Sequence, residues 1–187
     1  MRLFIAVDPG ERFRRDLSSR LDAWRARVSI AWVRPENMHL TLAFLGELPE
    51  TAPPALQEAL RAATAGSGPL VLRPGEVGAF PSLRSPRVLV LHCDSGGRLE
   101  RLAAAVRAAT DPLLPPGQRD DKPFRSHLTL ARIKRPLSPA EQRELAGMRL
   151  GEWEPLPIAE VRLVRSVLGP AGPTYTDLCA VPLTGPA

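Results

Sequence analysis

The tetrapeptide His-Leu-Thr-Leu occurs twice in this chain, at residues 39–42 and again at residues 127–130. The chain has only three histidines among 187 residues, so composition does not account for two of them in identical segments. In a β-strand, successive side chains point to opposite faces, which would place His39 and Thr41 on one face and the two leucines on the other. In a helix, the histidine and the threonine of each motif would lie on different faces, and no apolar stripe at helical spacing runs through either segment. The repeat therefore predicts two half-buried strands, each with a His/Thr face.

The composition is that of an ordinary globular protein, with 44% hydrophobic and 24% charged residues. The first apolar stretch is too short for a secretory signal, and no run is long enough to cross a bilayer, so we expect a cytoplasmic protein that has no membrane partner. The two cysteines, Cys93 and Cys179, lie in apolar strand-like segments without metal-ligand spacing. They are expected to be buried reduced thiols.

The net charge of +5 comes mostly from arginine, because only Lys122 and Lys134 are lysines among the 25 basic residues. The planar guanidinium pairs with phosphate through two hydrogen bonds, so an arginine-rich surface fits a polyanionic partner. Enrichment in arginine and proline can also follow from genome composition or from thermal adaptation of loops. Charge alone therefore gives only a weak indication of nucleic acid.

Hydrophobic periodicity and turn residues divide the chain into alternating short elements. We expect helices at residues 11–27, 53–65, 97–109 and 139–147, a loop at 111–122, and strands at 2–7, 30–33, 38–45, 70–77, 87–93, 124–133, 153–168 and 175–182, with Gly46 ending the first motif strand. Each half of the chain thus has helices, strands and one His-x-Thr motif. We expect an α+β fold with antiparallel sheets, in which residues 1–187 form a single domain of two pseudo-symmetric lobes and the motif strands face each other across a cleft.

Two histidines that face each other can divide acid–base work, because imidazole exchanges its proton near neutral pH. In displacement at phosphorus, one histidine would deprotonate the attacking hydroxyl or water while the other protonates the leaving oxygen. The hydroxyls of Thr41 and Thr129 would donate hydrogen bonds to the phosphoryl oxygens. This scheme needs neither a metal nor another cofactor, and the sequence has no Gly-rich phosphate loop that would indicate ATP.

The two motifs resemble the signature of the two-histidine phosphoesterase superfamily. Further segments resemble one branch, the RNA 2′,3′-cyclic phosphodiesterases, also called 2′-5′ RNA ligases. These segments are Arg2–Ala6, Trp32–Met38, Phe44–Gly46, Phe80-Pro81, Pro86–Val88 and Gly169–Tyr175. They cover nearly the whole chain in the expected order, so the resemblance is specific.

The resemblance implies a bilobal α+β fold and hydrolysis of RNA 2′,3′-cyclic phosphate ends to 2′-phosphomonoesters, with 2′-5′ ligation as the reverse reaction. It implies that His39 is the general acid for O3′, that His127 is the general base for water, and that Thr41 and Thr129 hold the phosphoryl oxygens. Symmetric sites can operate in either direction, so the residues alone leave the acid and base assignment open. The partner would be RNA, and we expect a monomer.

The resemblance also gives Phe44 and Arg132 a contact with the terminal nucleobase, by stacking and by hydrogen bonding or a cation–π contact. Strict alternation contradicts this, because it places Phe44 on the Leu42 face and places Ala131, not Arg132, on the Thr129 face. Both roles therefore require a bend or bulge in the strand. The third histidine, His92, has no threonine two residues on, and we expect a structural or surface role for it.

Other functions remain open from the sequence. The same chemistry could act on a small cyclic phosphate, such as a nucleoside 2′,3′-cyclic phosphate or ADP-ribose cyclic phosphate. The arginines and Phe44 would suffice for a non-catalytic RNA-binding module, but this alternative would leave the repeated motif unexplained. Arg125 and Lys134 are expected to give general electrostatic attraction to RNA rather than specific contacts. A metal site built on His39 and His127 is the third alternative, which insensitivity to a chelator would remove.

Overall fold

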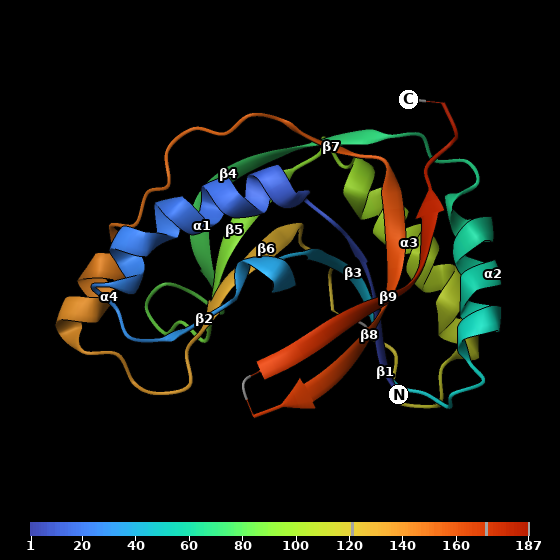
Figure 1. Cartoon of the computed structure of the whole chain (residues 1–187), viewed down its shortest axis with the longest axis horizontal. Helices are drawn as coiled ribbons and strands as arrows, with labels where there is room; N and C mark the ends of the chain where they lie inside the picture. Colours follow the sequence, from blue (N-terminus) through green and yellow to red (C-terminus); the bar gives the residue numbers. More distant parts are fainter. Residues whose placement is uncertain (121, 171, 187) are drawn as a thin grey trace.

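The computed structural model describes residues 1–120, 122–170 and 172–186. Two antiparallel sheets and four α-helices make up an α+β fold (Figure 1). The four-stranded sheet has the order β3-β1-β8-β9, and the five-stranded sheet has the order β2-β6-β5-β4-β7. The strands are β1 Arg2–Val7, β2 Ala31–Trp32, β3 Leu40–Glu47, β4 Leu70–Phe80, β5 Val88–Asp94, β6 His127–Arg132, β7 Leu156–Ile158, β8 Glu160–Gly169 and β9 Gly172–Pro182.

The helices are α1 Glu11–Arg25, α2 Pro53–Thr64, α3 Arg98–Thr110 and α4 Pro139–Ala146, with short 3-10 turns η1 Pro35–Asn37 and η2 Asp111–Leu113. The helices α2 and α3 lie at one end of the molecule and α4 at the other, while α1 runs from the α4 end toward the middle (Figure 1). The helices α2 and α3 pack on each other and contact β9 and β3, respectively. An ion pair between Arg27 and Glu144 links the end of α1 to α4. None of the described helices is both long and apolar enough to cross a membrane.

The expected helices and strands agree with the structure, except that several begin or end at other residues and that one expected strand forms two strands. Gly46 does not end the first motif strand: it has a φ of 73°, pairs with Leu3, and β3 continues to Glu47. The segment expected as one strand at residues 153–168 forms two strands in different sheets, β7 beside β4 and β8 beside β1. The expected loop 111–122 and the matched segment Gly169–Tyr175 include Asp121 and Ala171, which lie outside the described residues.

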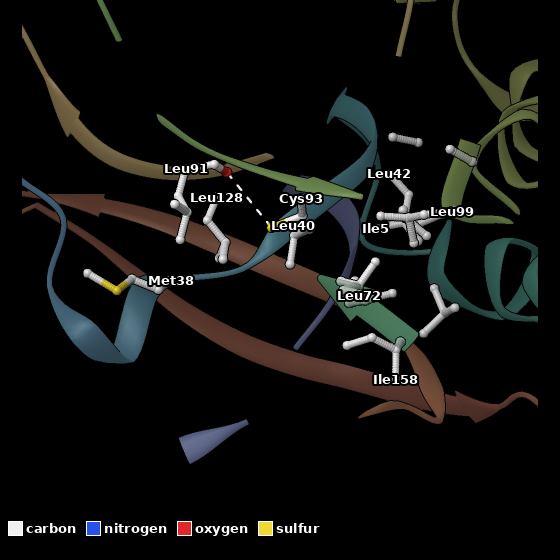
Figure 2. Close-up of a cluster of buried hydrophobic side chains, with 14 of the residues drawn as sticks. Ile5, Met38, Leu40, Leu42, Leu72, Leu91, Cys93, Leu99, Leu128 and Ile158 are labelled. Carbon is white, nitrogen blue, oxygen red and sulfur yellow. Dashed lines mark hydrogen bonds between the residues drawn. The ribbon is translucent and has the colours of Figure 1, made fainter. Parts of the chain in front are cut away.

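The two motif strands, β3 and β6, belong to different sheets and contact each other. Their leucines Leu40, Leu42, Leu128 and Leu130 are completely buried in one hydrophobic core that draws on both sheets (Figure 2). Burying an apolar side chain of this size stabilises a fold by about 1.5–3 kcal/mol. The repeated leucines therefore fix which face of each motif strand points away from the core.

The two cysteines are free thiols, as expected from the sequence. Cys93 is buried in the same core, and burial raises the pKa of its thiol to about 12. Cys179 is half-buried rather than buried, which corrects that part of the expectation.

Candidate active site

The face of the motif strands that points away from the core carries His39, Thr41, His127 and Thr129, and is called the motif face below. All four side chains are half-buried, whereas the intervening leucines are buried. His127 opens β6, and His39 lies one residue before β3. The predicted alternation is thus present in both motifs.

Both motif histidines are oriented by the same backbone contact. Nδ1 of His39 lies 2.8 Å from the carbonyl oxygen of Asn37, and Nδ1 of His127 lies 2.6 Å from that of Arg125. Since a carbonyl oxygen only accepts, each Nδ1 carries the proton and donates it, so the neutral form of each ring has its lone pair on Nε2. Within the described chain, neither Nε2 and neither threonine hydroxyl has a hydrogen-bond partner, which leaves all four groups available to a ligand.

A β-bulge in the first motif strand turns Phe44 onto the motif face. Ala43 lies opposite Ile5 while Thr41 lies opposite Ala6, so Leu42 is an extra residue in β3. Leu42 and Ala43 are consequently both buried, and Phe44 is 50% exposed. The bend that the nucleobase role of Phe44 requires is therefore present.

The second motif strand has a bulge at the equivalent place. Ala131 lies opposite Leu89 and Thr129 lies opposite Val90, which makes Leu130 the extra residue of β6. Leu130 and Ala131 are both buried, and Arg132 is exposed. Arg132 thus follows Thr129 on the motif face, as its expected role requires.

The electrostatic environment lowers the pKa of both motif histidines. Burial is the largest cause, and it lowers the pKa of His39 to about 4 and that of His127 below its ordinary value. The positive charge of Arg132 also lowers the pKa of both rings. Both lowered pKa values favour neutral rings near pH 7.

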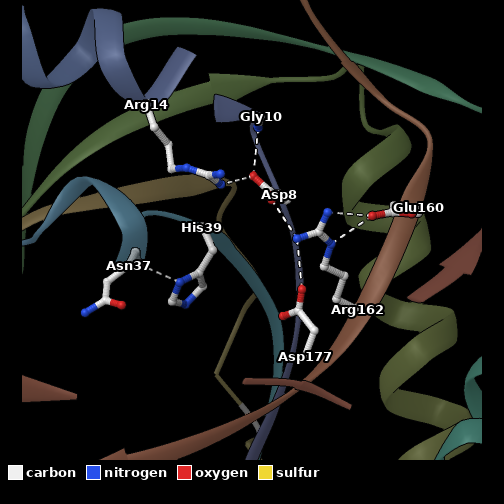
Figure 3. A network of polar contacts seen from close by, with 8 residues as sticks. All are labelled: Asp8, Gly10, Arg14, Asn37, His39, Glu160, Arg162 and Asp177. Atoms are coloured by element: carbon white, nitrogen blue, oxygen red, sulfur yellow. Dashed lines mark hydrogen bonds and ion pairs between the residues drawn. The ribbon is translucent and has the colours of Figure 1, made fainter. Parts of the chain in front are cut away.

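Several residues around His39 carried no role in the sequence analysis. The ring of Phe4 stacks on His39 at 4.7 Å between centroids, and Tyr175, the only tyrosine of the chain, meets it edge-on at 5.2 Å. Asp8 is held by Arg14 and by Arg162, which also binds Glu160 and Asp177 (Figure 3). A cavity of about 60 Å³ lies among these groups and His39. Phe4 and Tyr175 belong to segments that carried the family resemblance, whereas periodicity alone gives no sign of them.

The second histidine has a different surrounding. Phe80 meets His127 edge-on at 5.0 Å, and the guanidinium of Arg125 lies 5.9 Å from the centre of the Phe80 ring.

A larger open groove, of about 720 Å³, adjoins Phe44 and is lined by Gly46, Gln118, Arg119, Asp120, Lys122 and Pro123. Lys134, like Arg125, is exposed. No group of three or more His, Cys, Asp or Glu side chains suited to a metal ion occurs in the described ranges.

Comparisons with known proteins agree with one another. The family described as LigT like Phosphoesterase matches residues 11–90. An RNA 2′,3′-cyclic phosphodiesterase of Archaeoglobus fulgidus is 37% identical over 180 residues, which cover 95% of this chain and 98% of that protein. A crystal structure of a Thermus thermophilus protein superposes with a TM-score of 0.81 at 34% identity and covers 99% of both chains.

A second solved structure, E. coli LigT complexed with 3′-AMP, has a TM-score of 0.72 at 26% identity over 98% of both chains. The bilobal architecture is therefore shared along the whole chain. From the family match, the identity along nearly its full length and the shared fold, the chain is a hydrolase that belongs to the LigT-like phosphoesterase family.

Proposed function

We propose that this enzyme hydrolyses RNA ends that carry a 2′,3′-cyclic phosphate and leaves a 2′-phosphomonoester. The observation that carries the proposal is the matched pair of imidazoles, each with Nδ1 fixed by the carbonyl two residues before it and with Nε2 unpaired in the described chain. The activity named for the A. fulgidus relative supports the substrate class. The net charge of +5 suits a polyanion.

In the proposed reaction, the Nε2 atom of His127 accepts a proton from water as the water oxygen attacks phosphorus. The bond between phosphorus and O3′ breaks, and His39 donates its Nε2 proton to O3′. The hydroxyls of Thr41 and Thr129 donate hydrogen bonds to the two non-bridging oxygens, where negative charge accumulates. The reaction leaves His39 neutral and His127 protonated, and exchange with solvent restores both.

The anionic substrate itself supplies the acid form. In the free enzyme, burial and Arg132 favour a neutral His39. A phosphodiester placed between the two rings adds a negative charge at short range, which raises both pKa values and admits one proton to the pair. Exposed Phe44 would stack on the terminal base, and Arg132 would contact the base or the phosphate edge.

We propose that the reaction needs no metal and that 2′-5′ ligation is its reverse. The two-imidazole scheme moves both protons without a Lewis acid, and the adjacent Arg132 supplies positive charge. Residues 1–187 would act as one two-lobed monomer, a view that the single core containing leucines of both motif strands supports.

The test uses a short RNA with a 2′,3′-cyclic phosphate, with EDTA present, and identifies the product phosphate by its position. The expected product is the 2′-phosphate, and His39→Ala and His127→Ala should each lower kcat by about 10²- to 10⁴-fold. Melting curves of the variants control for folding. Activity that disappears with EDTA and returns with a divalent cation would contradict the metal-free scheme.

The substrate size is tested in the same assay with a mononucleoside 2′,3′-cyclic phosphate and with ADP-ribose cyclic phosphate. A higher kcat/KM for RNA supports the RNA assignment. A higher kcat/KM for a small substrate would keep the chemistry but overturn that assignment, and binding of RNA with no turnover would leave only the RNA-binding alternative.

A further inference from the structure

The third histidine, His92, is the cross-strand neighbour of His127. The two residues face each other in the ladder between β5 and β6. Directly opposed residues of antiparallel strands point to the same face, so His92 shares the motif face with His127. The ring of Phe80 meets both imidazoles edge-on, at 5.9 Å from His92 and 5.0 Å from His127.

Gly78 provides the space that the His92 ring occupies. A Cβ atom on Gly78 would lie 2.4 Å from Nε2 and 2.9 Å from Cδ2 of His92, closer than carbon atoms approach without displacement. Any other residue in this place on β4 would therefore push the ring away. Between Gly78 and Phe80, the packing holds His92 beside His127.

The first motif has a different residue at the equivalent place. Val7 faces Leu40 in the four-stranded sheet as Leu91 faces Leu128 in the five-stranded sheet. One step further, His92 faces His127 in the β5–β6 ladder, whereas the β1–β3 ladder ends at the Val7–Leu40 pair, and the next residues of the two segments are Asp8 and His39. Both Asp8 and His39 also line the cavity described above.

The two neighbours have opposite electrostatic effects. The negative charge of Asp8 raises the pKa of His39, against the larger effect of burial, whereas His92 further lowers the pKa of His127. The other charged groups around His127 are Arg132 on its own strand, which also lowers its pKa, and Arg125 on the preceding loop, whose guanidinium lies by Phe80. In the described chain, no carboxylate contributes to the pKa of His127.

We propose that His92 is a positioning residue that, when protonated, keeps His127 neutral and ready to accept a proton. This inference rests on the proposed two-histidine mechanism and deepens it. The two motifs are identical in sequence, so the choice of acid and base depends on the strand beside each motif. Beside the second motif, that neighbour is His92, which faces His127.

The direct test is an NMR titration of the imidazole signals in the free enzyme, in phosphate-free buffer. With three histidines, the signals are assigned from single His→Gln variants. His92→Gln should raise the pKa of His127 by about 0.5–1 unit and change that of His39 much less. His92→Lys keeps a positive charge at this place and should retain the low pKa of His127.

Gly78→Ala is the second variant, because it keeps His92 but displaces its ring. It should shift the pKa of His127 in the same direction as His92→Gln does. This result would show that the position of the His92 ring, and not only the presence of a histidine in the sequence, controls the pKa of His127. An unchanged pKa of His127 in both His92→Gln and Gly78→Ala would overturn the proposal. An equal shift in His92→Lys and His92→Gln would also overturn it, since charge would then have no part.

The kinetic readout is the pH profile of kcat/KM on the cyclic-phosphate RNA. The acidic limb reports deprotonation of the base, so His92→Gln should move this limb to higher pH and lower kcat/KM at pH 5 by about three- to tenfold, with the deficit shrinking as pH rises. Movement of the alkaline limb instead would contradict the assignment of His127 as base. Absence of turnover by the unaltered enzyme would overturn the proposed function, whereas the NMR titration would still decide whether His92 controls His127.

Discussion

The bulge that turns Phe44 outward is hydrogen-bonded to Arg107 of α3. Its Nε atom donates a hydrogen bond of 3.0 Å to the carbonyl of Leu42, the extra residue of β3. Its Nη1 atom donates to the carbonyls of Lys122, at 2.8 Å, and Asp120, at 3.3 Å, in the loop before the second motif. The Arg107 side chain, 20% exposed, thus links the first motif strand to the segment that leads into the second.

Arg107→Met keeps the aliphatic stem and removes these hydrogen bonds. A buried carbonyl left without a partner costs about 1–3 kcal/mol, and the more exposed loop contacts add less, so the free energy of unfolding should fall by about 2–3 kcal/mol. For a chain of this length, that corresponds to a decrease in Tm of about 4–12 °C. Because Phe44 loses its fixed direction, KM for RNA should rise by about three- to tenfold while kcat changes by less than about twofold.

Thermal melts and initial rates measure these effects, and Arg101→Met on the same helix is the matched control. Arg101 is exposed, and its change should alter stability by less than about 0.5 kcal/mol. A Tm and a KM for Arg107→Met that match those of the control would show that strand pairing alone holds the bulge, and would refute this reasoning.

Three further predictions concern the motif strands. Leu128→Ala should lower the free energy of unfolding by about 2–5 kcal/mol, because Leu128 is completely buried. Thr129→Ala should leave the melting curve unchanged and lower kcat by about ten- to a hundredfold. Urea unfolding and kinetics measure these effects, and the alternation of faces would be contradicted if the two variants exchanged them. Phe44→Trp should retain KM for RNA and Phe44→Ala should raise it, and equal KM values would exclude base stacking. The pKa of His39 in the folded protein, about 4, lies below the ordinary value of 6.5, so the folded protein should lose up to about 3 kcal/mol of stability as pH falls from 6.5 to 4. His39→Gln should abolish the part of this pH dependence that His39 causes. Urea titrations of both proteins at pH 7 and pH 4.5 measure the difference.

The sequence predicts most elements of this fold because their apolar periods are simple. The strand expected at residues 2–7 matches β1, and the helix expected at 11–27 corresponds to Glu11–Arg25. The division between β7 and β8 could not be predicted, because only tertiary pairing decides which sheet each strand joins. The continuation of β3 beyond Gly46 has the same cause: a left-handed glycine is typical of a turn, but pairing with Leu3 keeps it in the strand.

The candidate site was predictable where the signal is local and not where it depends on neighbouring strands. The histidines and threonines stand at spacings that a strand face requires, and the structure places all four on one face of their strands. The bulges at Leu42 and Leu130 leave only two adjacent apolar residues as their trace in the sequence. The neighbour His92 becomes visible only through the register of β5 with β6, and the place of Asp8 only through the cavity that it lines together with His39.

The two bulges divide each motif segment into a part with the same residues in both halves and a following position that differs. Each motif reads His-Leu-Thr-Leu-Ala, and the bulge buries the last two of these five residues, so the backbone follows the same path in both halves. The sixth residue, the first to emerge after the bulge, is Phe44 in one half and Arg132 in the other. In the proposed mechanism, duplicated geometry would preserve the acid–base chemistry, while an aromatic ring on one side and a cation on the other would let a nearly symmetric site hold a substrate whose two sides differ.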